Sequence, residues 1–265
     1  KIDQVLATIR AEDSQCSVED DKTKIFSAIQ STIGFGKINS MVFEQYRDWV
    51  ISVTVDAMEN CTEEVKRLRL CRVVGALYVG QGKYLSATPY LQESFQKMKT
   101  ILGVDNPDTL DSMNTLAFLH YNQGEYAQGL PLYEECVKKR KSILGEDHGD
   151  TLTSIHQLAM LYDAQGETDK ALPCCVEAHE KRTSILGENH PDTICSLFLL
   201  AKMCHLRRGY DMALQMYDEC LRKRKFVLGA NHPKTIDAMN NLAVLCVDLG
   251  EFVKGMWLHG ECLRK

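Results

Sequence analysis

The feature that most constrains the fold of this chain is a nine-residue phrase that returns every 42 positions. It reads ILGVDNPDT at 101–109, ILGEDHGDT at 143–151, ILGENHPDT at 185–193 and VLGANHPKT at 227–235. The blocks 101–142 and 143–184 agree at 20 of 42 positions, far more than unrelated sequences would. A repeat of this length predicts an array of similar units, each packed only on its neighbours.

Each unit is predicted to contain two helices joined by a short turn. Gly103 predicts the end of one helix, and Pro107 with Asp108 suits the first turn of the next. Apolar residues then return at intervals of three and four, which marks one face of a helix: Leu110, Met113, Leu116 and Ala117. Gly124 predicts the turn into a second helix, whose basic end reads KKRK at 138–141. Stacked pairs bury a continuous apolar core that a single pair could not.

These patterns resemble the tetratricopeptide repeat family. Small and aromatic residues at fixed places, as in LAFLHYNQGEYAQGLPLYEEC and LAVLCVDLGEFVKGMWLHGEC, are typical of that repeat. The period, the connector LGxxHPxT and the phrase MNNLA at 239–243 are similar to the kinesin light chain and nephrocystin-3-type subgroup. The resemblance implies an all-α fold, an α-solenoid whose helix pairs wind into a right-handed superhelix.

The resemblance covers residues 61–265, which we divide into five repeats: 61–100, 101–142, 143–184, 185–226 and 227–265. The first lacks the connector but keeps the turn and second helix in ALYVGQGKYLSATPYL. Residues 1–60 lie outside the repeat and show helical spacing at 2–10, 20–35 and 39–59, with a break at GFGK (34–37). We expect this segment to be a helical cap that covers the exposed end of the first repeat.

Composition excludes several classes of protein. The net charge of −5 argues against general nucleic-acid binding, which requires a basic field. No apolar run approaches the roughly 18 residues of a membrane span, so no membrane insertion is expected. We find no signal peptide, and because the chain lacks an initiator Met and stops where another connector would follow, we read it as part of a longer protein.

The eleven cysteines are an odd number, so they cannot all be paired in disulfides. Cys136, Cys220 and Cys262 share one position of the second helix, where Ala178 stands in the third repeat. Cysteine acts as a small apolar residue at such a site. The pattern predicts free packing thiols in the cytoplasm or another reducing intracellular compartment.

No motif indicates catalysis, a cofactor or a metal. The sequence has no glycine-rich phosphate loop, no H-E-x-x-H and no G-x-S-x-G. His148, His190 and His232 recur in the connector, and we interpret them as connector residues rather than ligands or bases. The basic runs at 138–141 and 221–225 are interpreted as solvated helix ends. We therefore expect no enzyme, no cofactor and no metal site.

The resemblance places function on the first helices, which line the concave face of tetratricopeptide superhelices. Three positions of each first helix then point into a groove: Arg72, Ala76 and Val79; Asn114, Phe118 and Tyr121; His156, Met160 and Asp163; Phe198, Lys202 and His205; Asn240, Val244 and Val247. Arg69 lies one turn before Arg72, and Asn241 follows Asn240 in the MNNLA phrase. The peptide-binding candidates are Arg69, Arg72, Asn114, Phe118, Tyr121, His156, Phe198, Lys202, His205, Asn240 and Asn241.

Aromatic rings, amides and scattered cations suit an extended peptide or a helix of a protein partner. Kinesin light chains hold short aromatic and acidic cargo peptides on this face. Here Asp111, Asp163 and Asp237 dilute the positive charge, so no preference for acidic ligands follows. The alternative for Phe118, Tyr121 and Phe198 is simple packing between neighbouring helices.

The predicted function is a non-enzymatic protein-interaction scaffold or adaptor. Two alternatives stay open. In the first, the chain is a structural subunit fixed in a larger complex through its convex face or termini. In the second, it is the regulatory repeat arm of a longer signalling protein.

Overall fold

The computed structural model describes residues 35–264, and all regular structure in that range is helical. The chain divides into two units, Lys1–Ala57 and Met58–Lys265. Two of the three predicted N-terminal helices lie outside the described residues. The third corresponds to α3 (Phe35–Glu59), which begins early enough to contain Gly36 and Lys37, so these residues do not form the predicted break. The capping role of residues 1–60 stays a prediction.

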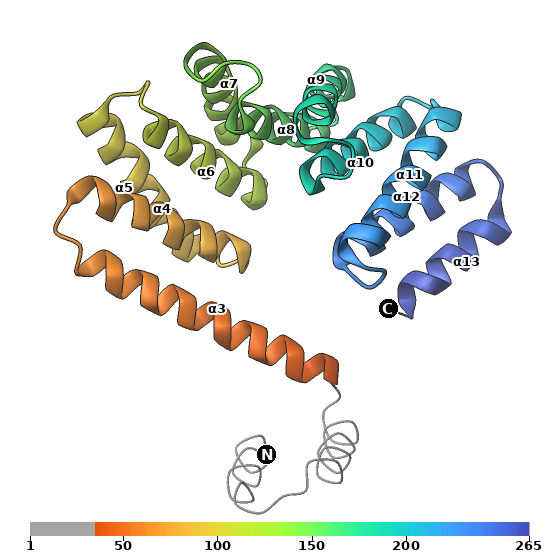
Figure 1. Cartoon of the computed structure of the whole chain (residues 1–265), viewed down its shortest axis with the longest axis horizontal. Coiled ribbons are helices and arrows are strands. Elements are labelled where there is room, and N and C mark those ends of the chain that lie inside the picture. Colours follow the sequence, from red (N-terminus) through yellow and green to blue (C-terminus); the bar gives the residue numbers. More distant parts are fainter. Residues whose placement is uncertain (1–34, 265) are drawn as a thin grey trace, which may run out of the picture. The chain divides into compact units, whose positions relative to one another are not determined.

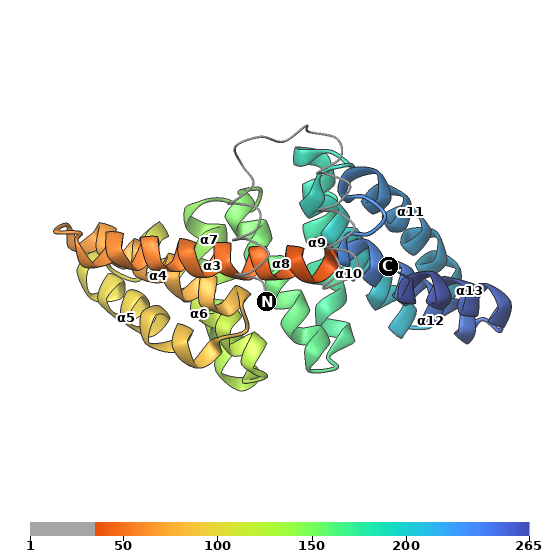
Figure 2. The same cartoon turned by 90° about the horizontal axis from the view of Figure 1, so that it is seen from below.

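The second unit is a row of helix pairs, which confirms the predicted α-solenoid. The pairs are α4 (Glu64–Gly80) with α5 (Tyr84–Leu102), α6 (Pro107–Gln123) with α7 (Tyr126–Ile143), α8 (Gly149–Ala164) with α9 (Thr168–Leu186), α10 (Pro191–Leu206) with α11 (Tyr210–Leu228), and α12 (Pro233–Asp248) with α13 (Phe252–Leu263). Each helix packs on the next, and the first helices of neighbouring pairs also touch. Within this unit, α6, α8 and α10 follow the inner side of an arc and α7 and α9 the outer side (Figure 1). Figure 2 shows the pairs succeeding one another from α4 and α5 to α12 and α13.

The connector fixes where each first helix begins. Asn106 accepts a hydrogen bond from the backbone N–H of Asp108 at 2.9 Å. The Nδ1 atoms of His148, His190 and His232 do the same for the residue two positions on, each at 3.2 Å. These side chains are N-caps that satisfy a backbone donor left free by the helix. The interpretation of the recurrent histidines as connector residues is confirmed.

Glycine is required where the second helices end. Gly187 has φ 84° and ψ 161°, and Gly103 and Gly229 have nearly the same angles. The ψ value separates these glycines from left-handed α geometry. Positive φ with an extended ψ is a region that glycine alone enters readily. Left-handed α geometry does occur at Gly124, which has φ 76° and ψ 9° in the turn between α6 and α7.

The cysteines of the repeat fill sites of close helix approach, as predicted. Cys136 and Cys220 are fully buried. Their Sγ atoms lie 3.5 and 3.8 Å from the carbonyl oxygens of Leu110 and Ile194 on the paired helix. Ser94 makes the equivalent bond in the first repeat, and all cysteines in the described part of the chain are free. A residue larger than Cys or Ser at this position would push the two helices apart.

Over residues 35–264, no helix combines the length and apolar character needed to cross a membrane.

Candidate functional site

The predicted groove residues belong to the first helices of the repeats, α4, α6, α8, α10 and α12. We define the inner face as the side of these helices that faces the hollow of the arc (Figure 1). Their exposure differs along the row. Asn114 and Asn240 occupy the same position of their repeats, yet the Asn114 side chain is buried, at 8% exposed, and Asn240 is exposed. Equivalent sequence positions are therefore not equivalent sites.

The arginines of the first repeat are used between helices. Arg69 forms a two-pronged ion pair with Asp108, with nitrogen–oxygen distances of 2.9 and 2.6 Å. Arg72 lies 3.4 Å from the carboxylate of Asp111. Both pairs join α4 to α6. Surface pairs of this kind contribute little stability, but they occupy the cations that a partner would otherwise meet.

Asn114 departs from the expected open position. Its Nδ2 donates to Gln157 Oε1 at 2.7 Å, and its Oδ1 accepts from Ser154 at 2.8 Å. Both partners belong to α8. The amide predicted to hold a peptide backbone is thus buried as a link between the second and third repeats.

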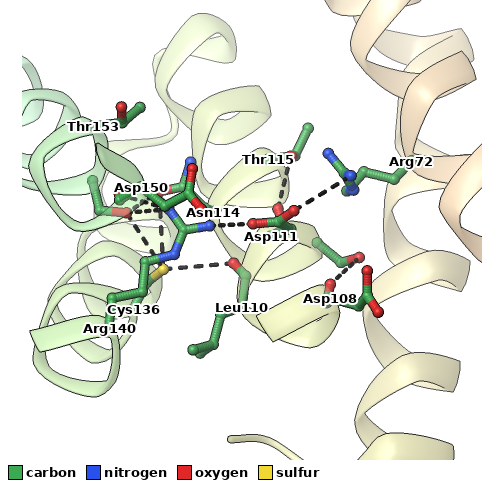
Figure 3. Close-up of polar contacts among 12 residues, drawn as sticks. Arg72, Asp108, Leu110, Asp111, Asn114, Thr115, Cys136, Arg140, Asp150 and Thr153 are labelled. Carbon is green, nitrogen blue, oxygen red and sulfur yellow. Dashed lines mark hydrogen bonds and ion pairs between the residues drawn. The ribbon is translucent and has the colours of Figure 1, made fainter. Parts of the chain in front are cut away.

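Around Asn114, a buried polar network joins three repeats (Figure 3). Arg140 Nη2 on α7 pairs with Asp111, and Arg140 Nη1 donates to Ser154 at 2.8 Å and to the carbonyl of Asp150 at 2.9 Å. Burial raises the pKa of Asp111, while Arg72 and Arg140 oppose that shift. A carboxylate between two guanidinium groups satisfies charges that would be costly if left alone.

Arg140 has equivalents that sequence reasoning missed. Arg182 and Arg224 stand 42 and 84 positions further on, and the three are 3%, 4% and 3% exposed. Each donates Nη1 to the backbone of the next first helix, at Asp150, Asp192 and Lys234 respectively. The interpretation of the basic runs at 138–141 and 221–225 as solvated helix ends is wrong for Arg140 and Arg224. The exact 42-residue spacing of the three arginines within otherwise variable runs was the available signal.

Aromatic side chains form a half-buried patch on the second repeat. The rings of Phe118 and Tyr121 stack with centroids 6.2 Å apart, and Tyr126 lies 6.0 Å from Tyr121. Phe118 and Tyr121 also pack against the buried core. Burial raises the pKa of the Tyr121 hydroxyl. The patch therefore combines the two expectations, with one side of each ring in the core and the other accessible.

Phe198 is held from within the protein. The guanidinium carbon of Arg224 lies 4.2 Å from its ring centroid, and the Tyr217 ring is 5.8 Å away. A cation over an aromatic face is an attractive contact. Phe198 is thus largely a packing residue of the fourth repeat, as the alternative interpretation held.

His156 lies in a neighbourhood of positive charge. Its Nδ1 is buried and has no hydrogen-bond partner. Burial, together with Arg182 and Lys234, lowers the pKa of His156 to about 3 from an ordinary 6.5. The ring is therefore neutral at physiological pH.

Lys202 and His205 also have partners on neighbouring repeats. Lys202 Nζ contacts Asp163 at 2.6 Å, and His205 Nε2 contacts Asp248 at 2.8 Å. These pairs tie α10 to α8 on one side and to α12 on the other. Like the arginines of α4, they stabilise the register between repeats.

On α12 the three predicted groove positions are exposed. Asn240, Val244 and Val247 form one stripe along α12, and the two valines are 42% and 38% exposed. Asn241 points elsewhere, because its Nδ2 donates to the Asp237 carbonyl of its own helix at 2.9 Å. The side chains of this stripe and of the aromatic patch form no ion pair among the described residues.

Within residues 35–264, no three metal-ligating side chains converge on one point.

Comparisons with known proteins agree with this geometry. Sequence models of the tetratricopeptide repeat match residues 68–108, 112–174 and 156–225, together more than half of the chain. Among solved structures, a protein of Podosopora anserina, described as a kinesin light chain with nearly identical TPR-like repeats, is 21% identical. The match covers 77% of this chain and 96% of that one, with a TM-score of 0.65.

Two further structures have the same arrangement of helices. BtubC (BKLC) from P. vanneervenii is 17% identical over 82% of this chain and 90% of its own, with a TM-score of 0.66. The apo form of RapI is 12% identical over 81% and 88%, with a TM-score of 0.60. At these identities the likeness shows the fold alone. No protein with curated annotation matches the chain.

Proposed function

Because this chain belongs to the tetratricopeptide repeat family, we propose that it is a non-enzymatic protein-interaction scaffold whose inner face binds an extended peptide or a helix of a protein partner. The observation that carries this proposal is the open stripe of Asn240, Val244 and Val247 on α12. Apolar side chains beside an amide suit both modes of peptide recognition, since the valines contact side chains and the amide bonds backbone.

The ion pairs between the first helices limit which side chains can contact a ligand. Arg69, Arg72, Lys202 and His205 already contact carboxylates of neighbouring repeats. A ligand that recruited them would first have to break those pairs. We therefore place the main contacts on the aromatic patch of Phe118, Tyr121 and Tyr126 and on the α12 stripe.

The test is selection of ligands from a displayed peptide library, followed by calorimetric titration of the enriched peptides. The double variant Asn240→Ala/Val244→Glu changes two exposed residues of the stripe, so it should keep the fold while weakening binding at least tenfold. The matched control is Leu85→Glu, because Leu85 is 90% exposed and lies on α5, outside the inner face. Equal binding by both variants would show that the α12 stripe does not contact the ligand. If Tyr121→Ala in the aromatic patch also bound equally well, the interaction would move to the outer face and the fixed-subunit alternative would be favoured.

A further inference from the structure

The last junction of the solenoid reverses the sign of a charge that the earlier junctions share. The second residue of the first helix is Asp108, Asp150 and Asp192 in three successive repeats. In α12 that residue is Lys234. Cys195 likewise stands one 84-residue interval after Asp111, the carboxylate that pairs with Arg140.

Arg224 has no carboxylate partner among the described residues, because Cys195 occupies the position from which Asp111 pairs with Arg140. Arg140 pairs with Asp111, whereas Arg224 donates to the Lys234 carbonyl and lies over the Phe198 ring. Its Nε has no hydrogen-bond partner, although the side chain is only 3% exposed. A buried guanidinium without a counter-ion is costly, and it favours any site where an anion can approach.

A cavity of about 130 Å³ lies beside this arginine. It is lined by Pro191, Ile194, Cys195, Arg224, Leu228, His232 and Lys234. The Lys234 ammonium donates a hydrogen bond to Cys195 Sγ at 3.6 Å. The cavity opens at the N-terminus of α12, where the helix dipole also favours negative charge.

The surroundings supply no compensating acid. Asp192 on α10 is exposed and faces His190 at 3.8 Å, and Asp237 on α12 is exposed as well. Neither forms an ion pair with Arg224 or Lys234 among the described residues. The neutral His156 ring is the neighbour that Lys234 and Arg182 affect electrostatically, which marks the same excess of positive charge.

We propose that the cavity between α10, α11 and α12 binds a single oxyanion, a phosphate or carboxylate group, through Arg224 and Lys234. The guanidinium of Arg224 on α11 offers a planar fork of donors, and the ammonium of Lys234 on α12 supplies a second cation. The volume suits one such group and excludes a large aromatic side chain. This site is separate from the α12 stripe, so the anion-binding proposal and the peptide-binding proposal can be tested independently.

The test is titration of the intact chain with inorganic phosphate at constant ionic strength, followed by backbone amide NMR. Saturable shifts of the backbone amides of residues 194–196 and of His232, Lys234 and Thr235 are expected. Lys234→Asp restores the residue of the earlier repeats, so it should fold normally and bind phosphate at least tenfold more weakly. Lys138→Asp makes the same charge change at an exposed position of α7 and should bind like the wild type.

A parallel titration with acetate distinguishes the two ligand sources, because the group that binds more tightly identifies the chemistry. Absence of saturable shifts with both anions would overturn the site. So would equal weakening in Lys234→Asp and Lys138→Asp, which would show attraction to net charge alone. Thermal unfolding of each variant without anion separates lost binding from lost fold.

Discussion

The side-chain amide of Asn114 donates a hydrogen bond to Gln157 at 2.7 Å and so links α6 to α8. The same register in the last repeat holds Asn240, which is exposed. One residue type at one repeat position thus has a structural role in the middle of the row and an open surface at its end. Substitutions of Asn114 and Asn240 therefore compare a buried and an exposed asparagine at the same repeat position.

Asn114→Ala should lower the free energy of unfolding by about 1–3 kcal/mol, because it leaves the polar groups of Ser154 and Gln157 without their partner in a buried site. Asn240→Ala should change it by less than about 0.5 kcal/mol. Urea unfolding of both variants checks the difference. Equal losses would contradict the contrast in burial.

Gly187→Val should destabilise the repeat array through the backbone. A β-carbon at Gly187 meets no atom within 4 Å, so the cost comes from its positive φ and extended ψ, about 1–3 kcal/mol. Gly149→Ala is the control, since Gly149 begins α8 with ordinary helical geometry and equally open space. Thermal melting should show a lower midpoint for the first variant alone. If both melt like the wild type, Gly187 is not constrained.

Gly149→Pro should stabilise the protein by about 0.4–1 kcal/mol. Proline occupies this position in α6, α10 and α12, and the first helical residue needs no N–H for the helix. The preceding His148 has φ −69° and ψ 138°, which a following proline permits. A lower denaturation midpoint would show that the third junction differs in backbone from the others.

Replacing Arg140 and Arg182 by Met should have opposite effects. Met98 already fills this position in the first repeat and is fully buried. Arg182 has no carboxylate partner among the described residues, so Arg182→Met should be neutral or stabilising. Arg140→Met removes one of the two guanidinium partners of Asp111 and should cost about 1.5–3 kcal/mol. Chemical denaturation near pH 7 measures both. A similar loss in the two variants would mean that the backbone hydrogen bond matters more than the charge.

His156 should make stability depend on pH. The unfolded chain takes up a proton near pH 6.5, whereas the folded ring resists it until about pH 3. Protonation therefore favours the unfolded state, and the free energy of unfolding should fall as pH drops below about 6.5, by up to about 1.4 kcal/mol per pH unit.

Unfolding curves between pH 7.5 and 5 should show a shallower decline for His156→Gln than for the wild type. Above pH 7 both proteins carry a neutral side chain at this position, so their pH dependence should agree there. Parallel curves over the whole range would show that His156 ionises freely in the folded protein.

The sequence by itself determined the features that depend on neighbouring residues in the chain. The period of 42, the N-caps at Asn106, His148, His190 and His232 and the glycine that ends each second helix are local, because each acts on backbone within a few residues. The packing role of Cys136 and Cys220 also follows from the repeat, since equivalent positions face equivalent helices.

Only the tertiary structure decided which inner-face residues are free. Arg72, Asn114, Lys202 and His205 find partners 39 to 43 positions away, on the adjacent first helix. Whether such a partner is present depends on the particular residue of the neighbouring repeat, and periodicity cannot supply that. The buried arginines could not be predicted for the same reason, because a basic helix end has the same sequence pattern whether it faces water or the next repeat. Packing of one repeat on another selected Arg140, Arg182 and Arg224 for the interior and left Arg224 without a carboxylate.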